Sequence, residues 1–409
     1  MRIVIHDFAG HAPQYDLAQE LARRHNDVLY LYAADVLGPR PALDDSGKYG
    51  GYLRVAPLLL GTTKKYSYVH RLIGQRRFAH RLRERIADFQ PDCVLSANSP
   101  TDVQITALRF CRRRGIPFVH WVTDFYSFAL EVLLSRRFGL VGRSVALPFH
   151  ILERQIFRLS DAVIYISEDF DEYARSRGLT CAQSCVIHTW APLADIPISP
   201  KSNRWSQQHG LADKFVFMYC GTMGLKHNVQ LVVQLADRFK SDAKVAIVVV
   251  SEGVGRDSLE RQKALEGLGN IHLLDFQKHS DLSEVLATAD VLFATVEADS
   301  GVFCVPSKVL AYCCAGRPIL LLAPTRNLMA RTITMAHAGA CFEPHDFGSF
   351  LEAASRLRTD EKSRDLLGAN ARAYSEATFN IERIATRFLD VIRRLPLPNR
   401  SEPVQRSRG

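Results

Sequence analysis

The chain has 409 residues, of which 47% are hydrophobic and 23% charged, and its formal net charge at neutral pH is +9. This length exceeds what a single hydrophobic core supports, so we expect two domains. No apolar run reaches the roughly 20 residues of a membrane-spanning helix, and we expect no secretion signal. The nine cysteines are odd in number and lack a zinc-type spacing. We therefore expect free thiols, which are typical of the reducing cytosol.

Strands and helices are predicted to alternate through the first half of the chain. The strands are continuous apolar runs, which indicates a parallel sheet covered by helices on both faces. We expect strands at 2–5, 28–32, 93–96, 117–122 and 162–166, and helices at 13–24, 71–89, 102–114 and 152–159.

A second alternating set follows a segment rich in proline at 191–203, which we interpret as a linker. We expect strands at 215–220, 244–250, 271–274, 291–295 and 319–322, and helices at 229–239, 256–266, 281–289, 307–315, 352–358 and 380–393. The fold class is therefore α/β, with two doubly wound domains facing a cleft. The expected divisions are a first domain at 1–198, a second at 204–375, a helix within 376–395 and a disordered tail at 396–409.

The segment from Val302 to Pro318 predicts a helix that begins at Ser307, directly after Pro306. Free backbone N–H groups, the Ser307 hydroxyl and the Lys308 ammonium would then occupy one small volume, which suits a phosphate group. The alternative is an ordinary capped core helix.

Four loops in the second half follow predicted strands, so in a parallel sheet they share one edge. Together they would supply a phosphate cradle, a carboxylate for hydroxyl groups and an apolar shelf, as a nucleotide-diphosphate sugar requires. Plain connecting loops are the alternative. A dinucleotide site is disfavoured because Ser258 stands where the third glycine of its motif belongs. The candidate donor-binding residues are Gly221, Thr222, Lys226, Ser251, Glu252, Phe276, Gln277, Glu297, Asp299, Ser300, Ser307 and Lys308.

The motifs most typical of a known family are those at 10–14, 121–127, 166–170, 188–192, 221–228, 251–253, 275–277 and 305–308. Through them the chain resembles bacterial glycosyltransferases of the GT-B fold, family 4, from the group that builds exopolysaccharides and is often labelled colanic-acid-type. The resemblance implies a hexosyltransferase (EC 2.4) whose first domain binds the acceptor and whose second binds the donor. It also implies a final helix that crosses back to the first domain, and retention of anomeric configuration.

One departure from that family concerns a pair of glutamates eight positions apart. Phe303 and Ala311 stand at those two positions here. Glu297 or Asp299 could take over the contact to the sugar hydroxyls, or Ser307 and Lys308 could hold the donor through its phosphates.

The departing diphosphate must be stabilised by positive charge or by helix-terminal N–H groups when no metal takes part. Lys226 and Lys308 are our candidates for that role. Asp169 and Asp171 form the chain's Asp-x-Asp pattern, but they lie at a predicted helix start, where the helix dipole stabilises acidic side chains. We therefore expect a metal-independent reaction that uses no cofactor and takes a nucleotide sugar, specifically a UDP-sugar, as co-substrate.

Asp124 and His11 are the catalytic candidates in the first domain. Asp124 follows a strand and could accept a hydrogen bond from the acceptor hydroxyl, or it could cap the next helix. His11 lies in the first strand-to-helix loop and could contact the transferred sugar, or it could be an ordinary loop residue. His120 is expected to be a buried core residue.

Basic residues cluster in the first half: ten Lys or Arg face one acid between Lys48 and Arg85. A second cluster holds Arg109, Arg112, Arg113, Arg114, Arg136, Arg137 and Arg143. These are either solvated faces or binding surfaces for anions.

A basic helix with Arg77, Arg81 and Arg85 on one side and Leu72, Phe78 and Leu82 as an apolar stripe could lie on an anionic membrane. We therefore expect a cytoplasmic protein, peripheral on the inner face of the membrane, with a polyprenyl-diphosphate-linked saccharide acceptor and no nucleic acid partner.

Two other functions remain open from the sequence. A sugar-nucleotide epimerase of the same fold would convert its nucleotide sugar without an acceptor. A non-catalytic protein that binds anionic lipid would bind no nucleotide.

Overall fold

The structure is a computed structural model, and it describes residues 1–36, 40–44, 49–61, 68–97, 99–223, 228–296 and 305–397. The side chains of 68–72 are not described. Four of the candidate site residues, Lys226, Glu297, Asp299 and Ser300, therefore lie outside the described residues, as does nearly all of the tail expected to be disordered.

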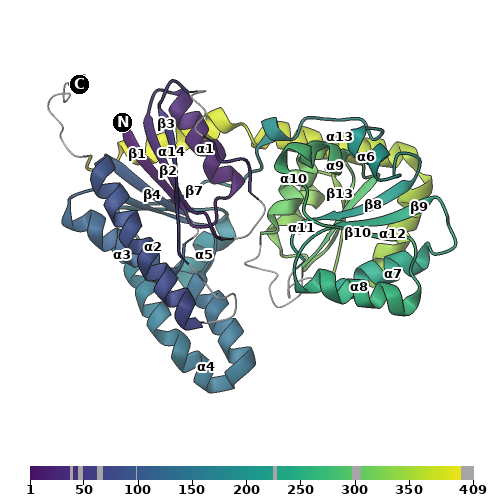
Figure 1. Cartoon of the computed structure of the whole chain (residues 1–409), viewed down its shortest axis with the longest axis horizontal. Coiled ribbons are helices and arrows are strands. Elements are labelled where there is room, and N and C mark those ends of the chain that lie inside the picture. Colours follow the sequence, from purple (N-terminus) through teal and green to yellow (C-terminus); the bar gives the residue numbers. More distant parts are fainter. Residues whose placement is uncertain are drawn as a thin grey trace. The chain divides into compact units, whose positions relative to one another are not determined.

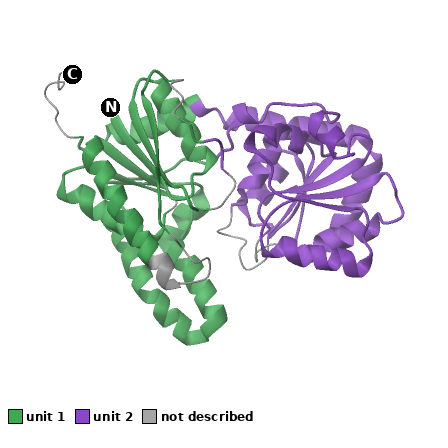
Figure 2. Cartoon of the chain, viewed as in Figure 1, with its two compact units in different colours: residues 1–37, 43–188, 382–409 green, residues 38–42, 189–381 purple. Residues whose placement is uncertain are grey.

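The chain divides into two compact units, coloured separately in Figure 2. The first comprises residues 1–37, 43–188 and 382–409, and the second comprises 38–42 and 189–381. The proline-rich segment at 191–203 thus belongs to the second unit.

The first unit is built on a parallel sheet of seven described strands in the order β3-β2-β1-β4-β5-β6-β7. Because the strand order reverses between β1 and β4, the loops after these two strands diverge and leave a place for a ligand at the carboxyl edge. The strands are β1 (Arg2–Asp7), β2 (Asp27–Ala33), β3 (Leu53–Leu58), β4 (Cys93–Ala97), β5 (Phe118–Val122), β6 (Ala162–Tyr165) and β7 (Ser184–Val186). The helices are α1 (Ala12–Arg23), α2 (Tyr68–Phe89), α3 (Thr101–Arg113), α4 (Tyr126–Leu159), α5 (Glu168–Ser176) and, from the end of the chain, α14 (Ile381–Arg393).

Helix α14 packs on the first unit, and it is yellow in Figure 1. The ring of Phe388 contacts Trp121 of β5 at a centroid distance of 4.7 Å. Near the start of the helix, Arg23 of α1 donates to Glu382 at 2.8 Å. The apolar side of α14, with Ile384, Leu389 and Ile392 buried, thereby completes the cover of the first sheet.

The second unit repeats the design, with six described parallel strands in the order β10-β9-β8-β11-β12-β13. The reversal here lies between β8 and β11. The strands are β8 (Phe215–Cys220), β9 (Val245–Val250), β10 (Ile271–Leu274), β11 (Val291–Thr295), β12 (Ile319–Leu322) and β13 (Gly339–Phe342). The helices are η1 (Leu193–Asp195), α6 (Arg204–Gln208), α7 (Val229–Arg238), α8 (Val254–Glu266), η2 (His279–Asp281), α9 (Leu282–Ala287), α10 (Ser307–Ala315), α11 (Leu328–Met335), α12 (Phe347–Thr359) and α13 (Glu361–Thr378).

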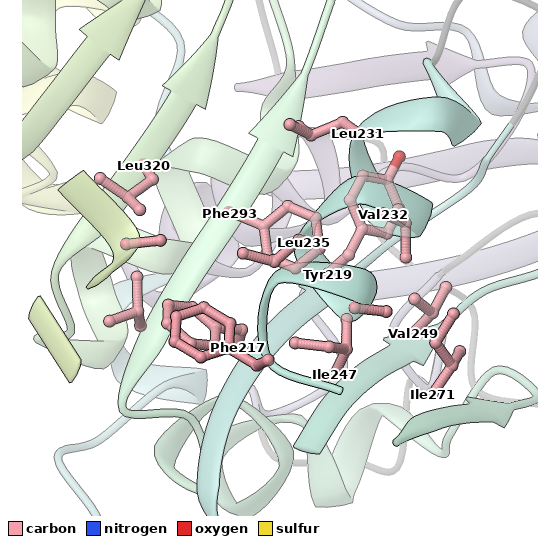
Figure 3. Close-up of a cluster of buried hydrophobic side chains, with 14 of the residues drawn as sticks. Phe217, Tyr219, Leu231, Val232, Leu235, Ile247, Val249, Ile271, Phe293 and Leu320 are labelled. Carbon is pink, nitrogen blue, oxygen red and sulfur yellow. The ribbon is translucent and has the colours of Figure 1, made fainter. Parts of the chain in front are cut away.

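The core of the second unit lies between this sheet and its covering helices (Figure 3). Phe217 and Tyr219 of β8 belong to the same buried cluster as Leu231 and Leu235 of α7, and all four side chains are fully buried. β8 and β9 can be continuous apolar runs because helices cover both faces of the sheet. This packing fixes where each strand ends, and so where the loops of the site begin.

Most predicted elements are present, and the omissions share a cause. The elements that were not predicted are the edge strands β3, β7 and β13 and the helices α5, α6, α11 and α13, which are short or polar, so their apolar pattern is weak. The prediction of a helix only at 152–159 was also too short. α4 begins at Tyr126 and consists of two helices joined at Gly139, which has a positive φ of 57°.

The apolar stripe expected to meet a membrane on α2 was wrong for two of its three residues, and the side chain of the third, Leu72, lies outside the described part of the chain. Phe78 and Leu82 are fully buried in the core of the first unit, where they pack beside Leu31 and Val94. Their helical spacing reflects burial against the sheet, which produces the same amphipathic pattern as a membrane surface.

Candidate functional site

Asp7 and His11 lie at the strand-order reversal of the first sheet. Asp7 ends β1 and is fully buried. Its carboxylate accepts a hydrogen bond from the His11 backbone N–H, and its Oδ1 lies 3.0 Å from His11 Nδ1. Tyr30 of β2 donates to the same carboxylate at 3.3 Å. Burial alone would raise the pKa of Asp7, but the charge and hydrogen bonds of His11 hold that pKa below its ordinary value. An ionised Asp7 thus orients the imidazole of His11, which is itself partly exposed.

Two buried histidines lie beneath this edge. His6 Nδ1 is 3.1 Å from Ser96 Oγ of β4, and His120 Nδ1 of β5 is 2.7 Å from the side-chain amide of Gln104. Burial lowers the pKa of each imidazole to about 4, so both are neutral at physiological pH. His120 is therefore a hydrogen-bonded core residue, and the network holds the ends of β1, β4 and β5 together.

Asp124 lies on a small pocket at the same edge, after β5. The pocket has room for about one water molecule and is also lined by Ser99, Gln104, His120 and Glu153. Burial raises the pKa of Glu153, with Asp124 adding a smaller contribution. The N-cap of α4 is Phe125, so Asp124 does not occupy the capping position. Asp124 and His11 follow β5 and β1, which β4 separates.

In the second unit, Gly221 and Lys308 meet at the carboxyl end of β8. Gly221 has φ 141°, and a Cβ there would stand 2.9 Å from Lys308 Cε. The Lys308 ammonium donates to the hydroxyl of Tyr219 and, at 3.2 Å, to the carbonyl of Thr222. It also lies 4.3 Å from the centroid of the Tyr219 ring. The glycine therefore allows a cation from α10 to lie directly against the loop after β8.

A second tyrosine attaches α10 to the same strand end. The buried hydroxyl of Tyr312 accepts from the Cys220 N–H at 2.8 Å and donates to the Cys220 carbonyl at 3.0 Å. Ser307, at the first position of α10, is exposed, and Pro306 is the N-cap with no side-chain cap hydrogen bond. The start of α10 therefore presents its N–H groups and a hydroxyl beside the Lys308 ammonium.

The loop after β9 packs closely on the loop after β8. Gly253 has φ 113°, and a Cβ there would stand 3.0 Å from the Met223 carbonyl, which accepts from the Gly255 N–H at 2.9 Å. Ser251 is fully buried, whereas Glu252 is exposed. Glu252 is thus the described carboxylate of this loop that can reach a ligand.

The loop after β10 is tied to its surroundings. Gln277 accepts from Trp205 Nε1 at 3.0 Å, so its amide is already engaged, and Phe276 is half-buried. Arg256 of α8 pairs with Asp275 at 3.0 Å and thereby links the loops after β9 and β10.

Of the predicted donor residues, the structure brings Gly221, Thr222, Ser307 and Lys308 together, and it puts Ser251 and Glu252 in the adjoining loop. Sequence reasoning missed Asp7, Tyr219, Tyr312 and Arg256. The only signal for Asp7 was its spacing of four residues from His11, and no local sequence signal distinguishes the two tyrosines from ordinary core residues.

Asp169 and Asp171 lie in the first turn of α5, with Ser167 as N-cap, and Asp171 pairs with Arg175 at 2.6 Å. In the described part of the chain, no group of three or more His, Cys, Asp or Glu is placed to hold a metal ion.

Among the described residues, no helix combines the length and apolar character needed to cross a bilayer.

Family models match both units of the chain. The model described as "Glycosyltransferase Family 4" matches residues 14–194, and the model "Glycosyl transferases group 1" matches residues 201–374. The chain belongs to glycosyltransferase family 4. The two matched ranges meet near the boundary between the two units, so each family domain corresponds to one of the doubly wound sheets.

Individual relatives agree with this family and with the GT-B fold. The chain is 23% identical over 267 residues to WcaI of Escherichia coli (strain K12), which is described as a colanic acid biosynthesis glycosyl transferase. The match covers 62% of this chain and 63% of WcaI. HepE of Anabaena, solved with UDP and glucose, has a TM-score of 0.69 at 15% identity, covering 97% of this chain and 100% of that one. Sucrose-phosphate synthase of Thermosynechococcus elongatus has a TM-score of 0.74 at 16% identity, covering 96% and 98%.

Proposed function

We propose that this family 4 glycosyltransferase moves a sugar from a nucleotide-diphosphate sugar, specifically a UDP-sugar, to a polyprenyl-diphosphate-linked saccharide in cell-surface polysaccharide biosynthesis. The observation that carries the proposal is the position of Lys308. Its ammonium lies at the start of α10 against the glycine-containing loop after β8. A cation and the free N–H groups of a helix start are what a departing diphosphate requires.

The donor class is supported by the family and by HepE, whose structure was solved with UDP and glucose. The polysaccharide context is supported by WcaI, which is assigned to colanic acid biosynthesis. We propose a metal-independent reaction because Lys308 and the α10 N-terminus supply positive potential directly. We propose retention of configuration on the family resemblance.

Residues of the first unit would contact the acceptor and the transferred sugar. Asp124 lies on the pocket after β5 and would accept a hydrogen bond from the attacking hydroxyl. His11, oriented by Asp7, would contact the transferred sugar from the loop after β1. These two roles differ in kind, so their loss should be separable in kinetics.

Acceptor-dependent release of UDP from the purified protein tests the proposal. A panel of UDP-sugars would be offered with and without polyprenyl-diphosphate-linked saccharide, in the presence and absence of EDTA. We expect release that requires the acceptor and persists in EDTA, and a product whose anomeric configuration matches the donor. Conversion of the nucleotide sugar without acceptor would identify an epimerase instead, and failure to bind any nucleotide would contradict both enzymes.

A further inference from the structure

The first unit carries an exposed apolar surface that the proposed chemistry does not use. Helix α4 is a hairpin of two helices that extends beyond the sheet (Figure 1). Leu140 is 78% exposed, Val141 67% and Phe138 52%. Other large apolar side chains exposed on this hairpin are Leu133, Val145, Leu147 and Ile151. Single exposed apolar residues are ordinary, but a contiguous set marks a binding surface.

The hairpin has a defined geometry. Gly139 adopts a left-handed backbone conformation, φ 57°, which turns the chain between the two helices. A Cβ at Gly142 would stand 2.2 Å from the carbonyl oxygen of Leu134, so this glycine lets the helices touch. Near the base, Ser127 Oγ lies 2.8 Å from His150 Nδ1, and His150 Nε2 lies 3.0 Å from Glu131. The apolar tip is therefore presented by a braced element.

The exposed side chains follow the helix period. Leu140, Leu147 and Ile151 are separated by seven and four residues, so they share one face of the second helix. Gly142 and Ala146 of the same helix are buried and form the opposite side. The apolar outward face is thus distinct from the face that packs.

The charge of this segment has one sign. Between Glu131 and Glu153 the sequence contains Arg136, Arg137 and Arg143 and no acid. All three arginines are exposed, and Arg143 is 3.6 Å from Glu131. Exposed apolar residues flanked by arginines are what a helix needs to lie in the interface of an anionic bilayer.

We propose that the tip of the α4 hairpin, residues 136–147, docks this protein on anionic lipid bilayers by inserting Phe138, Leu140 and Val141 among the headgroups. The purpose of docking, which is to bring the enzyme to its lipid-linked acceptor, rests on the proposed function. The binding itself does not, and it is measured without catalysis.

Vesicle flotation of the full-length protein tests the proposal. The vesicles would be phosphatidylcholine alone or phosphatidylcholine mixed with phosphatidylglycerol. We expect flotation with the anionic vesicles only, and weaker flotation as salt rises from about 0.1 to 1 M, because the Debye length falls from about 10 to 3 Å.

The tip variant Leu140→Ser/Val141→Ser should lose flotation at least about 10-fold. Replacing Arg136 and Arg137 with Gln should weaken binding by about fivefold per arginine. The matched control is Val254→Ser/Leu265→Ser, a pair of exposed apolar residues on α8 of the second unit, which should float like the wild type. Because every substituted side chain is exposed, the melting temperature should not change.

Three results would overturn the proposal. The first is no flotation with anionic vesicles at low salt. The second is a tip variant that floats like the wild type. If the variant Arg76→Gln/Arg81→Gln then loses flotation, the lipid contact lies on α2 instead. The third is a concentration-dependent dimer that the tip variant abolishes in the absence of lipid binding, which would make the hairpin a protein interface. UDP release with a water-soluble saccharide acceptor, measured in parallel, separates failure of docking from failure of the proposed reaction.

Discussion

Gly221 and Lys308 approach each other so closely that a Cβ on Gly221 would stand 2.9 Å from Lys308 Cε. The two residues come from β8 and α10, far apart in the sequence. Because Gly221 has no side chain, the Lys308 ammonium reaches Tyr219 and Thr222 at the strand end. This approach is the structural basis of the proposed diphosphate site.

Replacing Gly221 with Ala should damage both the fold and the site. The backbone has φ 141°, which side chains with a Cβ rarely adopt, and the added methyl would displace Lys308. We expect the free energy of unfolding to fall by about 1–3 kcal/mol and UDP binding to weaken. Gly269→Ala is the control, since its Cβ would meet nothing within 4 Å. Wild-type UDP affinity and melting temperature in Gly221→Ala would contradict the close approach.

Lys308→Met keeps the length of the side chain and removes its charge. We expect calorimetry to show UDP binding weakened by about 10-fold or more, which is about 1.4 kcal/mol. Lys240→Met is the matched control, because Lys240 is exposed in the connection between α7 and β9 and donates to the Glu266 carbonyl. Equal UDP affinity in the Lys308→Met and Lys240→Met variants would exclude Lys308 from the donor site.

Asp7→Asn should impair catalysis while leaving donor binding intact. The amide removes the charge that orients His11 while it preserves the shape of the buried side chain. We expect kcat to fall by about 10-fold or more with little change in KM for the donor. Asp161→Asn is the control, since Asp161 accepts from the Phe118 N–H at the opposite edge of the same sheet. A change confined to melting temperature would indicate that Asp7 is purely structural.

The first unit should lose stability in mild acid. His6 and His120 have pKa values lowered by burial to about 4, whereas an unfolded histidine titrates near 6.5. Between these values the unfolded chain binds more protons, so the free energy of unfolding falls as pH drops from about 6.5 to 4, by up to about 3 kcal/mol per histidine.

Hydrogen exchange of β1, β4 and β5 amides at about pH 7.5 and pH 5, corrected for intrinsic exchange, measures this loss. His120→Gln should reduce the pH dependence, whereas His80→Gln, which changes an exposed residue of α2 paired with Glu84 at 3.2 Å, should not. Equal protection at the two pH values would contradict the prediction.

Periodicity and apolar runs were enough to predict two doubly wound domains, because a strand buried on both faces must be apolar throughout. The same reasoning placed Ser307 and Lys308 at a helix start and Gly221 after a strand. These are local properties, because proline and glycine act on the backbone at or next to their own positions, and an apolar run is recognised without its packing partners.

Long-range packing decided the rest. Tyr219 and Tyr312 read as ordinary apolar positions, and only the pairing of β8 with α10 showed that their hydroxyls hold Lys308 and the end of β8. The apolar spacing of α2 suits a membrane and a core equally well, and the structure buries Phe78 and Leu82. Conversely, Phe138, Leu140 and Val141 at the tip of α4 are exposed, because the turn at Gly139 carries that end of the hairpin away from the sheet. Sequence pattern determines which residues avoid water, but only tertiary packing determines which of them the fold covers.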